Sequence, residues 1–146
     1  MFVREMLDVA RDALVTVDAD RPLIEAAQRL CAGTDILIVV GSSGELRGIV
    51  TKTDIVRQMS RCDGTHCRCA ISTVMTRDVA ACTATDRLQD VADRMKQRHL
   101  KTIPVVDQIN RPIGVLTARS ILRVLLSDAE YEEAQLVDYV KGVGYR

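Results

Sequence analysis

Aromatic residues are nearly missing from this sequence, which has no Trp, one Phe and three Tyr, 3% of the residues in all. Proteins that bind single-stranded nucleic acid usually need aromatic side chains on which the bases stack. Net charge is missing as well, since 20 Lys and Arg residues are matched by 20 Asp and Glu residues. No overall field therefore draws the chain to nucleic acid or to an anionic membrane, and no nucleic-acid partner is expected.

Long apolar runs are also absent. The run "ILIVVG" at 36–41 is among the longest, far below the roughly 20 residues of a transmembrane helix. Charges at Arg4 and Glu5 argue against a signal peptide. The five cysteines are an odd number in a chain without an export signal, which favours reduced thiols over a disulfide framework. We expect a soluble, cytoplasmic protein with no membrane partner.

The sequence does contain an internal repeat. "GIVTKTDIVRQM" from Gly48 returns as "GVLTARSILRVL" from Gly114, an offset of 66 residues (114 minus 48). "ILIVVG" aligns with "TIPVVD" (102–107) at the same offset, and "RPLIEAAQRL" (21–30) aligns with "DRLQDVADRM" (86–95) at an offset of 65. The one-residue difference is expected between helix and strand. Repeats of this kind decide the whole fold.

Each copy predicts the same elements in the same order. Apolar residues at i, i+3, i+4 and i+7 predict an amphipathic helix in each, with Asp20 and Thr85 as N-cap candidates. Two Val/Ile-rich strands joined by a polar turn follow, and then a second helix from Asp54 or Ser120. The helix positions are Leu23, Ala26, Ala27 and Leu30 in the first copy and Leu88, Val91, Ala92 and Met95 in the second.

Short strands near 14–17 and 79–82 complete β-α-β-β-α twice, an α+β (mixed α/β) fold. Each copy needs a partner for its apolar sheet face, and the other copy across a pseudo-twofold axis is the natural one. The tail from Ser127 predicts a C-terminal helix, with Ser127 and Glu130 at capping-box spacing.

The stretch around Asp54 joins the end of a strand to the start of a helix. Free backbone N–H groups and the helix dipole favour an anion such as phosphate there. Thr51 or Thr53 could donate to a phosphate oxygen, and Asp54 could accept from the two hydroxyls of a ribose. The same residues are also typical helix caps, so this stretch alone leaves both interpretations open.

Several motifs together resemble a known family. They are the tandem repeat, the ending Gly-hydrophobic-hydrophobic-Thr in each copy, completed as Thr-x-x-Asp in the first, "IPVV" (103–106) and "VMTRDV" (74–79). In this order and spacing they resemble a tandem cystathionine β-synthase (CBS) domain pair, or Bateman module. The resemblance divides the chain into repeat 1 at 1–61, a Cys-rich linker at 62–72, repeat 2 at 73–126 and a helical tail at 127–146.

The resemblance implies a sensor and not an enzyme. Members of the family bind adenosine-containing ligands such as AMP, ADP, ATP or S-adenosylmethionine in clefts between the two copies. It implies a regulatory adenine nucleotide with no required cofactor, a homodimer of four repeats, and an effector protein reached in trans. No Ser-His-Asp, Cys-His or paired-carboxylate set emerges either, so a small enzyme is a less supported alternative.

Each cleft combines the threonine motif of one copy with the adenine pocket of the other. In cleft one, Asp54 would hold the ribose and Thr51 and Thr53 the phosphate, with Lys101 and Lys52 adding positive charge. Val79, Ile103 and Pro104 would wall the adenine. The implied set is Ile49, Thr51, Lys52, Thr53, Asp54, Val79, Ala80, Lys101, Thr102, Ile103 and Pro104.

Cleft two departs from the pattern. Ser120 replaces the aspartate, Ile38 stands in place of Pro104, and Asp35 stands in place of Lys101 and repels phosphate, which Arg119 offsets in part. We expect cleft two to be weaker, empty or selective for a less anionic ligand. Its set is Leu14, Val15, Asp35, Ile36, Leu37, Val115, Thr117, Arg119 and Ser120.

A cluster of soft ligands offers an alternative function. Cys62, His66, Cys67 and Cys69 could bind a metal ion or sense redox state, although their spacing suits a tetrahedral zinc site poorly. An ordinary linker is the simpler interpretation. Cys31 and Cys82 are predicted to be small core residues. His99 is predicted to interact with a helix dipole, with a phosphate contact as the alternative.

Overall fold

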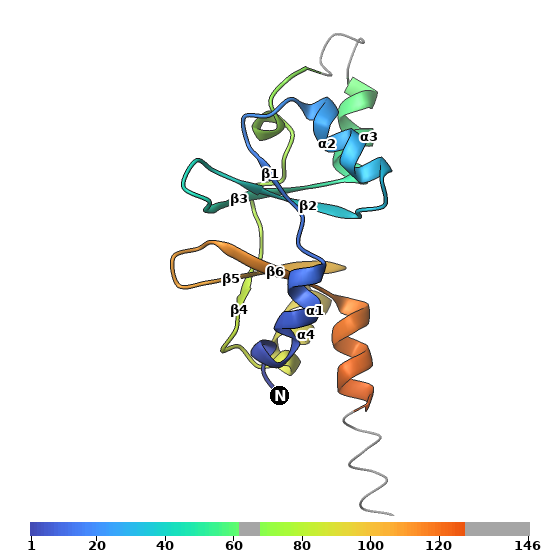
Figure 1. The fold of residues 1–146 in the computed structure, drawn as a ribbon. Helices are drawn as coiled ribbons and strands as arrows, with labels where there is room; N and C mark the ends of the chain where they lie inside the picture. Colours follow the sequence, from blue (N-terminus) through green and yellow to red (C-terminus); the bar gives the residue numbers. More distant parts are fainter. Residues whose placement is uncertain (62–67, 128–146) are drawn as a thin grey trace, which may run out of the picture.

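Two three-stranded sheets face each other at the centre of the molecule, with helices on their outer sides (Figure 1). This is a computed structural model, and it describes residues 1–61 and 68–127. The strand orders are β1-β2-β3 and β4-β5-β6, and in each sheet the first pair is parallel and the second antiparallel. The predicted α+β fold of two β-α-β-β-α repeats is confirmed.

The two repeats contain matching elements. The first has β1 (Thr16–Asp18), α2 (Leu23–Cys31), β2 (Ile36–Val40), β3 (Leu46–Thr51) and α3 (Lys52–Arg61). The second has β4 (Cys82–Thr83), α4 (Leu88–Gln97), β5 (Thr102–Val106), β6 (Pro112–Thr117) and a helix over 118–127. The segments ahead of them hold η1 (Val3–Met6) and α1 (Leu7–Asp12), and η2 (Ile71–Thr73).

Strand register repeats with the sequence offset. Ile36 pairs with Thr51 in the first sheet, and Thr102 pairs with Thr117 in the second. Each long hairpin shifts register at the same relative place, between Val39 and Val40 and between Val105 and Val106. The repeat found in the sequence is therefore a repeat in three dimensions.

The predicted helix caps are wrong. Pro22 and Arg87 occupy the N-cap positions of α2 and α4, and neither makes a side-chain cap hydrogen bond. The first helical amides bond instead to backbone carbonyls of distant segments, from Leu23 N to Cys69 O and from Leu88 N to Met1 O. A carbonyl from elsewhere in the chain thus satisfies the donor that Asp20 and Thr85 were expected to satisfy.

The one-residue offset is also placed differently from the prediction. α2 has 9 residues and α4 has 10, so the additional residue lies within the helix and not in the following connection. β1 and β4 begin two to three residues later than predicted, at Thr16 and Cys82.

The two repeats exchange the segments that precede their first strands. The segment before β1 packs on repeat 2, and the segment before β4 packs on repeat 1. Val3, Met6 and Ala10 are buried in the core of repeat 2, whereas Ile71 and Met75 are buried in the core of repeat 1. Figure 1 shows α1 in the same half of the molecule as β4, β5 and β6, and α1 contacts β6. The predicted domain boundaries follow chain order, which does not reveal this exchange.

The motif glycines make the exchanged packing possible. A Cβ on Gly48 would lie 2.6 Å from the Thr76 carbonyl oxygen, and a Cβ on Gly114 would lie 2.6 Å from the Ala10 Cβ. Such distances are too short for any side chain larger than hydrogen. Thr76 and Ala10 thus contact equivalent points of the two sheets.

A third apolar cluster joins the two sheets. It is formed by the buried residues Ile36, Ile38, Val40 and Val115, with Leu14, Leu46 and Ile49 packed against them. This cluster provides the contact between copies that the apolar sheet faces predict.

The C-terminal prediction is tested only at its start. Ser127 lies inside the helix that begins at 118 and does not begin a new one. The rest of the predicted tail lies outside the described residues. Within the described ranges, each helix is too short or too polar to cross a membrane.

Candidate functional site

A cavity of about 800 Å³ lies where α3 and the 118–127 helix begin. Residues of both repeats line it, and they are mostly polar. The lining consists of Asp35, Ile36, Thr51, Lys52, Thr53, His99, Lys101, Thr102, Thr117, Ala118 and Arg119.

Residues predicted for two separate clefts meet in this one cavity. Thr51, Lys52, Thr53, Lys101 and Thr102 come from the set of cleft one. Asp35, Ile36, Thr117 and Arg119 come from the set of cleft two. These are mainly the residues expected near phosphate, so the phosphate ends of both predicted clefts open into a shared space.

Positive charge dominates the cavity wall. Lys52, Lys101 and Arg119 line it together with a single acid, Asp35. Lys52 Nζ lies 3.6 Å from Asp35 Oδ1, with both side chains largely exposed. An ion pair this exposed is weak, and an incoming anion can displace it.

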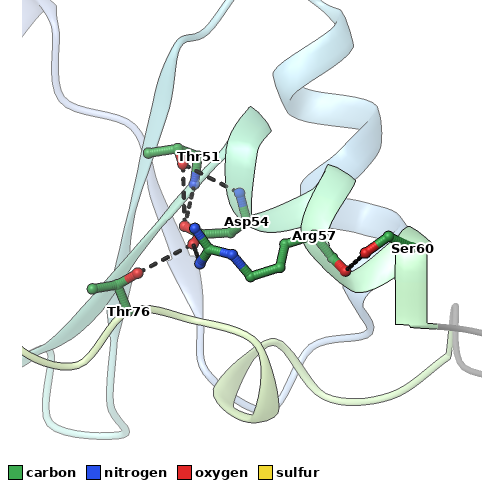
Figure 2. A network of polar contacts seen from close by, with 5 residues as sticks. All are labelled: Thr51, Asp54, Arg57, Ser60 and Thr76. Atoms are coloured by element: carbon green, nitrogen blue, oxygen red, sulfur yellow. Dashed lines mark hydrogen bonds and ion pairs between the residues drawn. The ribbon is translucent and has the colours of Figure 1, made fainter.

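Asp54 does not line the cavity but caps α3 (Figure 2). Its Oδ2 accepts from Thr51 N at 2.9 Å and from Thr51 Oγ1 at 3.2 Å, while Asp54 N donates to Thr51 Oγ1 at 3.4 Å. This reciprocal pairing is a capping box. Of the two interpretations left open by the sequence, the structure contains the cap.

The other oxygen of Asp54 is engaged as well. Thr76 Oγ1 donates to Oδ1 at 3.2 Å, and Arg57 Nη1 lies 3.5 Å from it. Figure 2 shows both contacts, and also Ser60, whose hydroxyl donates to the Arg57 carbonyl. Asp54 is only 6% exposed, and these contacts use about the four lone-pair directions that a carboxylate offers. A ribose could bind Asp54 only by replacing Thr76 or Arg57.

The second copy has a capping box without the charge. Ser120 Oγ accepts from Thr117 N at 3.2 Å and from Thr117 Oγ1 at 2.9 Å. Ser120 N donates to Thr117 Oγ1 at 3.0 Å. Ala10, which contacts Gly114 as Thr76 contacts Gly48, has no hydroxyl to offer Ser120.

The residues predicted near adenine fall into two groups. Ile103 and Leu37 are fully buried in the cores of their own repeats, so their side chains cannot wall a ligand in a cleft. The strand alternates its side chains, which turns these two toward the helix layer. Val79, Ala80, Leu14 and Val15 are half-buried, while Pro104 and Val115 are buried and Ile49 is half-buried at the sheet interface.

His99 ends α4 in a left-handed conformation, with φ of 55°. Its amide donates to Lys96 O and the Leu100 amide donates to Met95 O, which is the Schellman pattern of helix termination. Gly33, which follows the C-cap residue of α2, also has a positive φ, of 114°. The dipole prediction for His99 fits this position, and its side chain also lines the cavity.

Sequence reasoning gave no role to Thr76 or Arg57, although both contact Asp54. A signal for Arg57 was present, because Asp54 and Arg57 are three residues apart on one helix and such pairs are neighbours. Thr76 carried no comparable signal, since 22 residues separate it from Asp54.

The cysteines are placed unevenly. Cys82 is 1% exposed in the core of repeat 2, as predicted, and burial, with a smaller contribution from Asp86, raises the pKa of its thiol to about 12. Cys31 was predicted to be a core residue and is instead exposed. It lies one position beyond Leu30, which rotates it about 100° from the buried face of α2.

The proposed ligand cluster is only partly described. Cys69 is half-buried against the core of repeat 1, whereas Cys62, His66 and Cys67 lie outside the described residues. In the part of the chain that the structure describes, no group of three or more His, Cys, Asp or Glu side chains could hold a metal ion.

Comparison with known proteins agrees with the fold. A family model described as "CBS domain" matches residues 3–61 and 71–127. The L-aspartate semialdehyde sulfurtransferase of Methanosarcina acetivorans is 28% identical over 119 residues, 81% of this chain and 23% of that protein. The chain therefore spans about a quarter of that relative's length.

Solved structures give the same result. The CBS domain pair of protein MJ0100, in complex with 5′-methylthioadenosine and S-adenosyl-L-methionine, has a TM-score of 0.72 and 26% identity, covering 88% of this chain and 98% of that one. The CBS-domain containing protein ATU1752 from Agrobacterium tumefaciens has a TM-score of 0.73 and 25% identity, covering 85% and 98%.

Proposed function

The chain belongs to the CBS domain family as a tandem pair, and on that premise we propose that it is a regulatory module that binds an adenosine-containing ligand between its repeats. The candidates are AMP, ADP, ATP and S-adenosylmethionine or its relatives. The ligand would act as a signal and not as a substrate.

The observation that carries the proposal is the cavity at the helix starts. In this cavity the hydroxyls of Thr51, Thr53 and Thr117 lie together with the positive charges of Lys101 and Arg119. Hydroxyls and cations in this arrangement suit phosphate, because charge-assisted hydrogen bonds to phosphate are the strong ones. The first turns of two helices open on the same space and add to its positive potential.

The ligand would extend from this cavity past Asp54 toward the half-buried residues Val79 and Ala80. Its ribose hydroxyls would replace Thr76 and Arg57 as partners of the Asp54 carboxylate. The cap bonds from Thr51 to the other carboxylate oxygen could remain. The adenine would then lie against these two half-buried residues, since Ile103 and Pro104 are both buried and offer little surface to a ligand.

The similarity to the MJ0100 domain pair supports the ligand class. That pair was solved with two adenosine compounds, 5′-methylthioadenosine and S-adenosyl-L-methionine, neither of which carries a phosphate. Binding in cleft two, where Asp35 lies near the phosphate end and Ser120 replaces the aspartate, is proposed to be weaker for anionic ligands.

A homodimer is part of the proposal. Val56 and Met59 on α3, and Leu122 and Leu126 on the 118–127 helix, are apolar side chains more than half exposed. Covering such faces is favourable, and a second copy offers the same faces in return. We expect sedimentation analysis to give a dimer, which Leu122→Glu weakens. An effector protein reached in trans completes the proposal.

The test is to identify what the purified chain carries. The protein is denatured, and released small molecules are identified by mass spectrometry, for the wild type, Asp54→Ala and the control Asp86→Ala. Asp86 is a matched control because it also accepts a backbone bond, from Thr83 N, and lies outside the cavity. We expect an adenosine compound from the wild type and the control, and much less from Asp54→Ala. Equal recovery from Asp54→Ala would contradict the assignment of Asp54.

A further inference from the structure

The cavity at the helix starts joins the two threonine motifs in one space. Thr51 ends β3 ahead of α3, and Thr117 ends β6 ahead of the 118–127 helix, and both line it. The register of the two hairpins is the same, so the two threonines occupy equivalent ends of equivalent strands. A phosphate bound at either motif would therefore enter the same cavity.

The positive groups of the cavity are divided between the motifs. The resemblance assigns Lys101 to the cleft of Thr51 and Arg119 to the cleft of Thr117. Both nevertheless line the one cavity, and Lys101 O accepts a hydrogen bond from Ala118 N, beside Thr117. Lys52 is held partly by Asp35, at 3.6 Å. The positive charge of these side chains is too small to neutralise two triphosphates bound at the same time. Two phosphate chains in this volume would repel each other at short range, where salt screens little.

We infer that the two clefts share a single phosphate chamber, so that the module accepts one polyphosphate ligand at a time, whichever cleft holds its adenosine. This rests on the proposed function for the adenosine part, whereas the phosphate part stands on the cavity alone. Arg119, although it belongs to cleft two, then contributes to binding of a polyphosphate ligand in cleft one. A ligand without phosphate does not enter the chamber and does not compete for it.

The first experiment counts ligands by titration calorimetry of the full chain. ATP is expected to bind at one per chain, and inorganic tripolyphosphate is expected to displace it. Tripolyphosphate should leave the affinity for 5′-methylthioadenosine unchanged within about twofold, since an uncharged ligand has no charge in the chamber. Two ATP molecules bound per chain at the same time, with equal or unequal affinity, would overturn the inference.

The second experiment uses two arginines on one helix. Arg119 lines the cavity, and Arg123, one turn further along the same helix, does not. Arg119→Ala is expected to weaken ATP and tripolyphosphate by about tenfold, as loss of a charged hydrogen bond does, and to leave 5′-methylthioadenosine unaffected. Arg123→Ala should change neither. Equal effects of the two variants would contradict the shared chamber.

The two hypotheses fail differently in these experiments. If tripolyphosphate binds and depends on Arg119 but no adenosine compound binds, the proposed function is wrong and the chamber is supported. If ATP binds and neither tripolyphosphate nor Arg119→Ala affects it, the shared chamber is wrong and the proposed function is supported.

Discussion

Thr76 Oγ1 donates a hydrogen bond to Asp54 Oδ1 at 3.2 Å, which ties the segment ahead of β4 to the first turn of α3. In the other half of the molecule Ala10 occupies the place of Thr76 and Ser120 that of Asp54. The hydrogen bond between the leading segment and the helix start is therefore present at Asp54 and has no equivalent at Ser120. The two halves share a backbone plan but differ where a ligand would compete with the protein's own contacts.

The Asp54 cap is predicted to contribute more stability than its counterpart. Asp54→Ala leaves Thr51 N and the Thr76 hydroxyl without their acceptor, and we expect a loss of about 1–2 kcal/mol in the free energy of unfolding. Ser120→Ala removes a neutral cap with fewer contacts and should cost less. Urea denaturation of both variants measures the difference, and a larger loss for Ser120→Ala would contradict it.

The Thr76 hydroxyl is predicted to compete with the ligand. Thr76→Val keeps the shape of the side chain and removes the donor, so Asp54 accepts a ribose without first losing that bond. The affinity for an adenosine ligand is expected to rise by about tenfold, the equivalent of one hydrogen bond to a charged carboxylate. Thr73→Val is the control, because the Thr73 hydroxyl bonds to the Ala70 carbonyl and not to Asp54. Weaker binding by Thr76→Val would indicate that Thr76 contacts the ligand itself.

Much of the fold followed from periodicity in the sequence. The helix faces that include Leu23 and Leu88 and the strands that pair Ile36 with Thr51 were predictable, because burial imposes a fixed spacing on each. Cys31 was misplaced because it adjoins an apolar stripe without being part of it.

Contacts between distant segments were not predictable from a single sequence. The exchange of leading segments leaves no trace in residue spacing, since Val3 packs with Leu88 and Ile71 with Leu23. For the same reason, the sequence did not predict that the two clefts open into one cavity, because this also depends on contacts between distant segments. Motif spacing places Thr51 and Thr117 each at a strand end, but only the packing of the sheets decides that these ends adjoin.

The motif glycine of the second copy is predicted to tolerate no side chain. Gly114→Ala would place a Cβ 2.6 Å from the Ala10 Cβ and 2.9 Å from its backbone carbon, which must move apart. A loss of about 1–3 kcal/mol is expected from such overpacking. Gly41→Ala is the control, since its Cβ would meet only the flexible Glu45 side chain. Equal midpoints of thermal unfolding for the two variants would contradict the close packing of α1 on β6.

Cys82 is predicted to make the protein sensitive to alkali. Burial raises the pKa of its thiol from 9.0 to about 12, so the folded chain holds the proton more tightly than the unfolded chain does. This contribution to stability is complete below pH 9.0 and is lost as the pH rises toward about 12. When the pH is raised from about 8 to about 11, the urea concentration at the midpoint of unfolding should decrease more for the wild type than for Cys82→Ala. An equal fall in both would contradict the assignment.

The central claim is that an adenosine ligand binds where the two repeats meet, and backbone amide NMR of the ¹⁵N-labelled chain tests it most directly. Titration with AMP or ATP is predicted to shift the amides of Thr51, Lys101, Thr102 and Thr117 while leaving those of Asp90 and Asp93 on α4 unchanged. Saturable shifts confined to the outer helices, or no shifts with any adenosine compound, would contradict the account.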